Sequence, residues 1–171
     1  MLLKSDRIRL RAVEPEDLDL MYLVENDTSL WEGTTNTAPF SYAALRTFLA
    51  DSRGDLFIDR QLRLVVESLD RLPCGFLDLQ NFDPLNQRAE VGIVLLPEQQ
   101  HKGYAAESLR LLADYAATHL HLHQLYAYVA EGNTASSRLF ERSGYTHTAT
   151  LPQWLRTPKG WQDVRLYQLT L

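Results

Sequence analysis

Residues 91–112 read VGIVLLPEQQHKGYAAESLRLL, and the character of the chain changes twice within them. Val91 to Leu96 is an apolar run of strand length that stops at Pro97. A short polar loop follows, and Gly103 lies where this loop turns into a helix. From Ala105 onward, apolar residues recur at helical spacing, so one stripe of the helix can face a core. The stretch therefore predicts a buried strand, a loop and an amphipathic helix.

The start of this helix is suited to an anion. The first N–H groups of a helix have no partner within it, and its dipole places partial positive charge there. A phosphate is the ligand that such a site fits best. The alternative is an ordinary strand–turn–helix that binds nothing.

Two motifs give the chain a resemblance to a known family. Gln100-x-x-Gly103-x-Ala105 resembles the Q/R-x-x-G-x-G/A signature of the GNAT family of acetyl-CoA-dependent N-acetyltransferases. Residues 101–107 are similar to the form found in the branch that acetylates ribosomal-protein N-termini and spermidine. Residues 133–145 resemble a second GNAT signature, N-x-x-S/A-x-x-L-Y/F-E-K/R-x-G-F/Y. Residues 158–163 resemble a turn near the end of the same branch.

The order of the expected elements indicates one α/β (α+β) domain over residues 1–171. Strands are expected near 7–13, 62–69, 74–82, 88–96 and 124–129, with two more after 146. Four helices are expected, near 14–25, 41–51 and 104–118 and before Gly144. This is the GNAT order, which implies a mixed, mostly antiparallel sheet of about seven strands. The resemblance also implies a splayed parallel strand pair at the cofactor site.

Composition narrows the classes of partner. The formal net charge of −5 argues against nucleic acid and mildly favours a cationic substrate. No apolar run suits a membrane span, and the N-terminus lacks signal-peptide features, so a cytoplasmic location is expected. Cys74 is the only cysteine, which excludes an internal disulfide and a thiolate metal site. His119, His121 and His123 alternate with leucines, but no carboxylate pattern accompanies them, and we expect no metal.

The resemblance implies acetyl-CoA as co-substrate and assigns its contacts. Backbone groups of one strand would pair with the pantetheine arm, at Ile93, Val94 and Leu95. The loop would hold the pyrophosphate through Gln100, His101, Lys102, Gly103, Tyr104, Ala105 and Ala106. The second motif would contact the cofactor through Asn133, Ser136 and Phe140. A helix N-cap is the alternative role for Asn133.

The chemistry requires a neutral amine, because an alkylammonium has no lone pair with which to attack. Glu90 matches the family position for a general base, and a salt bridge with Arg88 or another cation is its alternative role. Many GNAT enzymes protonate the leaving thiolate with a tyrosine at the position of Phe140, which lacks a hydroxyl. Ser136 is the expected substitute, Tyr104 and Tyr145 are more distant candidates, and an acid is not obligatory.

The expected function is transfer of acetyl from acetyl-CoA to a primary amine, by direct attack in a ternary complex. The acceptor is either a polyamine or the α-amino group of a protein or peptide N-terminus, and the sequence leaves this choice open. Trp31 and Glu32 are expected to line the acceptor side. The competing function is a non-catalytic acyl-CoA-binding regulatory module. The oligomeric state is also open, a homo-oligomer included.

Overall fold

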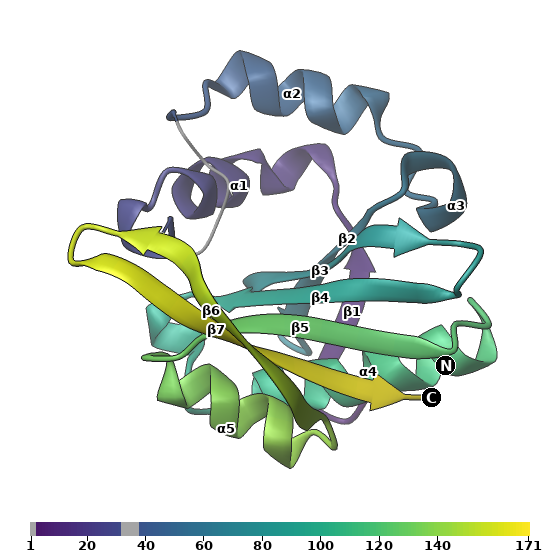
Figure 1. The fold of residues 1–171 in the computed structure, drawn as a ribbon. Helices are drawn as coiled ribbons and strands as arrows, with labels where there is room; N and C mark the ends of the chain where they lie inside the picture. The colour runs from purple at the N-terminus through teal and green to yellow at the C-terminus, as the bar shows by residue number, and fades with distance from the viewer. Residues whose placement is uncertain (1–2, 32–37) are drawn as a thin grey trace.

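The computed structural model describes residues 3–31 and 38–171 (Figure 1). The strands are β1 (Ile8–Ala12), β2 (Leu62–Ser68), β3 (Pro73–Asp83), β4 (Arg88–Leu95), β5 (Gln124–Ala130), β6 (Thr146–Thr157) and β7 (Gly160–Thr170). The α-helices are α1 (Leu18–Glu25), α2 (Tyr42–Asp51), α3 (Leu56–Asp59), α4 (Tyr104–Thr118) and α5 (Thr134–Arg142). Short 3₁₀ helices lie at Pro15–Asp17, Thr28–Leu30 and Pro97–Gln99.

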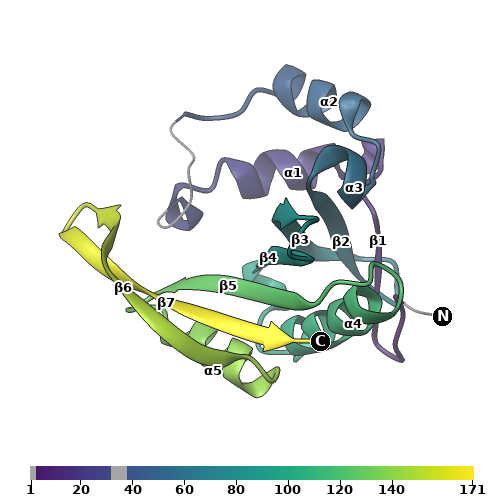
Figure 2. The ribbon, with the colours of Figure 1, turned by 45° about the vertical axis from the view of Figure 1, so that its right-hand side comes forward.

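The strands form one seven-stranded sheet in the order β1-β2-β3-β4-β5-β7-β6. Only the β4–β5 pair is parallel among these neighbours, as expected for strands joined by a helical crossover. Helices α1 and α2 lie over one face of the sheet, and α4 and α5 lie against the other (Figures 1 and 2). The predicted fold class is confirmed, and the structure adds the one-turn helix α3 to the four predicted helices.

The parallel pair separates soon after it begins. Its register covers only Arg88↔Gln124, Ala89↔Leu125 and Glu90↔Tyr126. Strand β4 continues to Leu95 along β3, whereas β5 pairs with β7 over its whole length. Past Glu90, the edges of β4 and β5 that face each other are therefore not joined by strand pairing, and this is the predicted splay.

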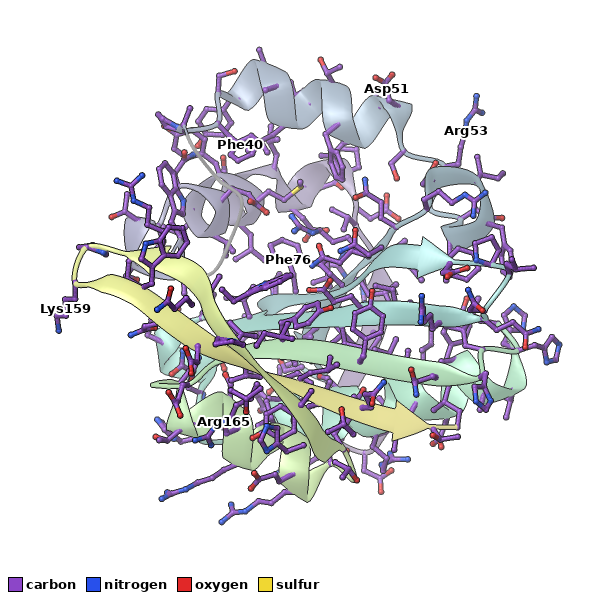
Figure 3. All side chains as sticks on the ribbon, in the orientation of Figure 1. Phe40, Asp51, Arg53, Phe76, Lys159 and Arg165 are labelled. Atoms are coloured by element: carbon purple, nitrogen blue, oxygen red, sulfur yellow. The ribbon has the colours of Figure 1, made fainter. Side chains whose placement is uncertain are left out.

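Two apolar cores hold the layers together. The larger core joins α4 and α5 to the sheet, and it includes the fully buried Leu109 and Leu112. The smaller core lies under α1 and α2, where Met21 and Leu45 pack with Phe76 from β3. Figure 3 shows Phe76 on the α1 side of the sheet and Phe40 at the entry to α2. Burial of each large side chain contributes about 1.5–3 kcal/mol, which fixes both helical layers on the sheet.

Helix ends follow local sequence signals. The Ser41 hydroxyl accepts a hydrogen bond from the Ala44 N–H at 3.1 Å and caps α2, as predicted. Gly144 follows α5 with φ +88°, a left-handed conformation that favours glycine after a helix. Asp55 caps α3 by accepting from the N–H groups of Phe57 and Ile58, so this carboxylate has a structural role.

Candidate cofactor and acceptor site

The loop between β4 and α4 presents unpaired N–H groups at a helix start. Gly103 has φ +81° and immediately precedes α4. The first N–H that reaches back into the helix is that of Glu107, bonded to the Gly103 carbonyl at 3.2 Å. Helix geometry therefore leaves the N–H groups of Tyr104, Ala105 and Ala106 without intrahelical acceptors. This arrangement has the geometry that the sequence predicts for an anion site.

Two side-chain hydrogen bonds hold the loop in place. The Gln100 amide donates to the Leu95 carbonyl at 3.1 Å, which ties the loop to the end of β4. The Lys102 ammonium donates to the Gln99 side chain at 3.0 Å and lies exposed at the surface. His101 takes a left-handed conformation with φ 60°, which turns the chain toward Gly103. The predicted loop residues are thus brought together at the end of β4.

The strand that leads to the loop uses its side chains for packing. Ile93 packs against the larger core and Val94 against the smaller one, while Leu95 is buried. A ligand in the splay therefore meets the backbone of this strand rather than these side chains. Backbone amide groups on an unpaired strand edge can bond to an amide-bearing ligand.

Gly92 is a feature of this strand that sequence reasoning missed. A methyl group on Gly92 would meet only the Asp78 Cβ, at 3.8 Å, and would project on the same face as Glu90. A glycine inside a strand often marks close approach of a ligand or another backbone. That signal was present in the sequence. The structure places Gly92 just past the point where β4 and β5 part.

Glu90 lies at the inner end of the splay. Its carboxylate accepts hydrogen bonds from the Gln80 amide at 3.3 Å and from the Asn81 amide at 2.7 Å. Arg88 pairs instead with Asp83, at 3.2 Å, and within the described residues Glu90 forms no salt bridge with Arg88 or another cation. Asn81 reaches Glu90 because a bulge interrupts the β3–β4 register between Gln80 and Asp83.

Tyr126 is the neighbour of Glu90 on β5. Burial raises the pKa of the Tyr126 phenol, and the charge of Glu90 raises this pKa further. From Tyr126, an aromatic row continues to Tyr128 and Trp154, with ring centres 5.7 Å and 6.3 Å apart. Tyr128 and Trp154 are exposed, so the row offers ring surface to a ligand beside Glu90.

Helix α5 lies below the sheet beside β7, and its start follows the end of β5 (Figure 1). Asn133 accepts from the Ser136 N–H at 3.0 Å, which confirms its N-cap role. Ser136 is half-buried in the first turn, and Phe140 is only 4% exposed. Tyr145 follows the far end of α5, with a buried hydroxyl that has no partner among the described residues. Burial raises the pKa of Tyr145, so this phenol is a poor proton donor.

A pocket of about 220 Å³ lies between α1, α2 and the sheet. Within it, Arg63 donates to Glu25 at 2.5 Å and to Asp78 at 2.8 Å. Gln80 also lines the pocket and connects it to Glu90. The other lining residues are Met21, Phe40, Ala44, Leu45, Phe48, Gln61, Leu62 and Leu79. The pocket therefore has an apolar wall, and the two carboxylates of Glu25 and Asp78 face the guanidinium of Arg63.

Of the predicted acceptor residues, Trp31 lies near this pocket and Glu32 lies outside the described residues. The Trp31 indole N–H donates to the Glu25 carbonyl at 2.8 Å, at the end of α1. Among residues 3–31 and 38–171, no group of three or more His, Cys, Asp or Glu side chains could hold a metal ion. Over the same residues, no helix combines the length and apolar character that a membrane crossing needs.

The free N–H groups at the start of α4, the unpaired strand edge beside them and the Glu90 carboxylate at its inner end together suit one class of protein. Such a protein holds a phosphorylated, amide-bearing carrier beside a proton acceptor. Residues 7–146 match the family model described as an acetyltransferase (GNAT) domain. The chain belongs to the GNAT family, and it is an N-acetyltransferase.

Comparisons with individual proteins agree with this family. A spermidine N(1)-acetyltransferase of Vibrio cholerae is 27% identical over 96% of this chain and 94% of the relative. A putative ribosomal N-acetyltransferase of Bacillus subtilis, YdaF, is 35% identical over 82% of this chain and 79% of the relative. The crystal structure of the Vibrio cholerae spermidine N-acetyltransferase with CoA and spermine superposes with a TM-score of 0.85 and 25% identity. That superposition covers 97% of this chain and 96% of the other.

Proposed function

We propose that residues 1–171 form one enzyme domain that transfers acetyl from acetyl-CoA to a primary amine by direct attack. The separation of β4 and β5 after Glu90 carries this proposal. The pantetheine arm has about thirteen chain atoms from phosphate oxygen to sulfur, roughly four residues' worth of extended backbone. An arm with its diphosphate at Gly103 and its amides along Ile93, Val94 and Leu95 would therefore end near Glu90.

The cofactor contacts follow from this placement. The diphosphate would bind the N–H groups of the loop, with Gln100, His101, Lys102 and Gly103 shaping the turn and Tyr104, Ala105 and Ala106 opening the helix. The arm would bond to the backbone of Ile93, Val94 and Leu95. Across the splay, Asn133, Ser136 and Phe140 of the α5 region would contact the arm and the sulfur end. CoA in the related Vibrio cholerae structure supports this assignment.

Glu90 acts as the base in the proposed chemistry. Its carboxylate takes a proton from the ammonium, directly or through water, and the neutral amine attacks the thioester carbonyl. A backbone N–H of β4 stabilises the oxygen as negative charge develops on it. The C–S bond then breaks, the nitrogen of the new amide passes its extra proton to the departing sulfur, and the Ser136 hydroxyl donates a hydrogen bond to that sulfur. Phe140 has no hydroxyl for this step.

The acceptor we favour is a polyamine. Glu25, Asp78 and Glu90 bring three carboxylates to one side of the sheet, against the single guanidinium of Arg63. The aromatic row through Tyr128 adds ring faces that attract cations. Spermine in the related Vibrio cholerae structure supports the same class. The α-amino group of a peptide is the second candidate, and Ser136 with the 35% identical ribosomal relative supports it.

Two supporting expectations concern the setting of the enzyme. The single cysteine is buried and free, which fits a reducing compartment, and we propose a cytoplasmic location. The net charge of −5 supports small cationic acceptors over nucleic acid or membrane surfaces.

The test is thiol release from acetyl-CoA with a panel of polyamines, amino acids and peptides. Glu90→Gln should lower kcat about 10²–10⁴-fold and shift the rising limb of the pH–rate profile upward. Asp83→Asn is the matched control, because Asp83 is another carboxylate of the β3–β4 hairpin and should leave the profile unchanged. An unaltered profile in Glu90→Gln removes Glu90 as the base. CoA binding without turnover on any amine would favour the regulatory module.

A further inference from the structure

The residue before β1 brings a cation to the start of α4. The Arg7 Nε donates to the Glu107 carboxylate at 2.8 Å, across a hundred residues of sequence. The Arg7 guanidinium carbon lies 5.6 Å from the centre of the Tyr104 ring. A methyl group on Gly103 would lie 2.9 Å from the Arg7 Nη2. The guanidinium therefore rests on the first turn of α4, against the glycine of the loop.

Glu107, the partner of Arg7, places a negative charge at the start of α4. Its carboxylate is the acidic group in the first turn of α4, and helical side chains lean toward the helix start. Burial opposes ionisation of Glu107, but hydrogen bonds from Ser5 and Arg7 outweigh it and lower the pKa of this carboxyl. Glu107 is thus an anion beside the N–H groups that a diphosphate would use. Without Arg7, this negative charge would repel such a ligand.

We propose that Arg7 is a positioning residue that sets the charge of the acetyl-CoA site. Its Nε cancels the charge of Glu107, and its Nη groups face the loop at Gly103. Within the described residues, these two Nη groups have no hydrogen-bond acceptor, so they remain available to a phosphate oxygen. This inference rests on the proposed function, because it concerns how the same loop selects a donor that carries phosphate. A donor that lacks the diphosphate gains nothing from Arg7.

A purely structural role for the pair makes different predictions. The Arg7–Glu107 bond also ties β1 to α4, but the Arg7 side chain is 52% exposed, and exposed ion pairs contribute little to stability. If the ion pair only held β1 to α4, breaking it would lower activity with every acyl donor equally. Loss of either partner would then also be harmful. In the charge-setting role, loss of Glu107 improves CoA binding and loss of Arg7 weakens it.

The experiment measures CoA affinity by calorimetry and steady-state kinetics with two donors, acetyl-CoA and acetyl-pantetheine. Arg7→Met should raise the Kd for CoA on the order of tenfold at low salt, and the effect should shrink as salt screens it. Glu107→Gln should lower the Kd roughly two- to threefold, and the double variant should fall between Arg7→Met and wild type, roughly three- to fivefold weaker than wild type. Arg7→Lys should keep most of the affinity. KM and kcat with acetyl-pantetheine should stay unchanged in Arg7→Met.

The outcomes separate the two claims. Wild-type CoA binding together with an unchanged Kd in Arg7→Met overturns the role of Arg7 alone. Equal losses with both donors, or weaker CoA binding in Glu107→Gln, also overturn it in favour of a structural tie. A wild-type protein that binds no CoA overturns the proposed function itself. Thermal unfolding of each variant shows that the compared proteins are folded.

Discussion

Replacing Gly92 by alanine should make the protein slightly more stable and much less active. The backbone of Gly92 is not in the left-handed region, and the new methyl group would meet only the Asp78 Cβ at 3.8 Å. No clash or strain opposes the change. Alanine also restricts the unfolded chain, which adds about 0.4–1 kcal/mol to the free energy of unfolding at a compatible site.

Activity should respond in the opposite direction. The methyl group stands two residues along β4 from Glu90, on the same face, where the proposed pantetheine arm ends. A displacement of the reacting atoms by roughly 1 Å can cost about 10²-fold in rate. We therefore expect kcat/KM to fall on the order of tenfold to a hundredfold, and further in Gly92→Val.

The assay pairs thiol-release kinetics with denaturant unfolding of the same samples. Gly132→Ala is the matched control, because its new methyl group would meet only the Gln162 side chain, at 3.9 Å, again without a left-handed backbone. It should show the small gain in stability and keep full activity. A Gly92→Ala enzyme with wild-type kcat/KM would refute the placement of the thioester beside Gly92.

Two further variants test the leaving-group step and the pH dependence of folding. Ser136→Ala should slow thiol release several-fold, with little change in KM, if the hydroxyl assists departure of the thiolate; equal rates in stopped-flow measurements would dismiss that role. Asp17→Asn removes a carboxylate that is 3% exposed and accepts from Arg11 at 2.7 Å and 2.8 Å. Burial opposes its ionisation, but the bonds from Arg11 and the Glu14 N–H outweigh it and lower the pKa of Asp17. Its stabilisation is therefore complete above the unfolded pKa, about 3.9, and is lost as pH falls through the lower folded value. Unfolding curves should show Asp17→Asn about 3 kcal/mol less stable at pH 7, with a smaller further loss toward about pH 2. A variant as acid-sensitive as wild type would contradict this assignment.

Local sequence signals predicted most of the fold, because each of these signals depends only on residues that are close in the sequence. The apolar run after Val91, the cap at Ser41 and the left-handed Gly144 all depend on near neighbours. The short helix α3 was missed because a single turn has no measurable periodicity, although Asp55 carries an N-cap signal.

The parts of the site that were missed depend on contacts between distant segments. Apolar and charged residues alternate along β1, which predicts that Arg7 and Arg11 point to solvent. In the structure, Arg7 pairs with Glu107 and Arg11 pairs with Asp17. The hydrogen bond from Asn81 to Glu90 requires the bulge between Gln80 and Asp83, which no local sequence pattern predicts. Such pairings arise from strand order and twist, which a linear pattern does not contain.

The charge of the whole chain makes the local arrangement at the loop necessary. In the proposed function, a chain of net charge −5 binds a polyanion, and at the loop Lys102 bonds to Gln99 while the Arg7 Nε bonds to Glu107, which leaves the Arg7 Nη groups for a phosphate. In the proposed complex, the N–H groups at the start of α4 therefore supply part of the attraction, because they act at short range. Arg7 then contributes by removing a local repulsion. The same negative charge is left on the acceptor side, where it favours a cationic amine. In the proposed function, one acidic chain thus binds an anionic donor at the loop before α4 and a cationic acceptor beside Glu90.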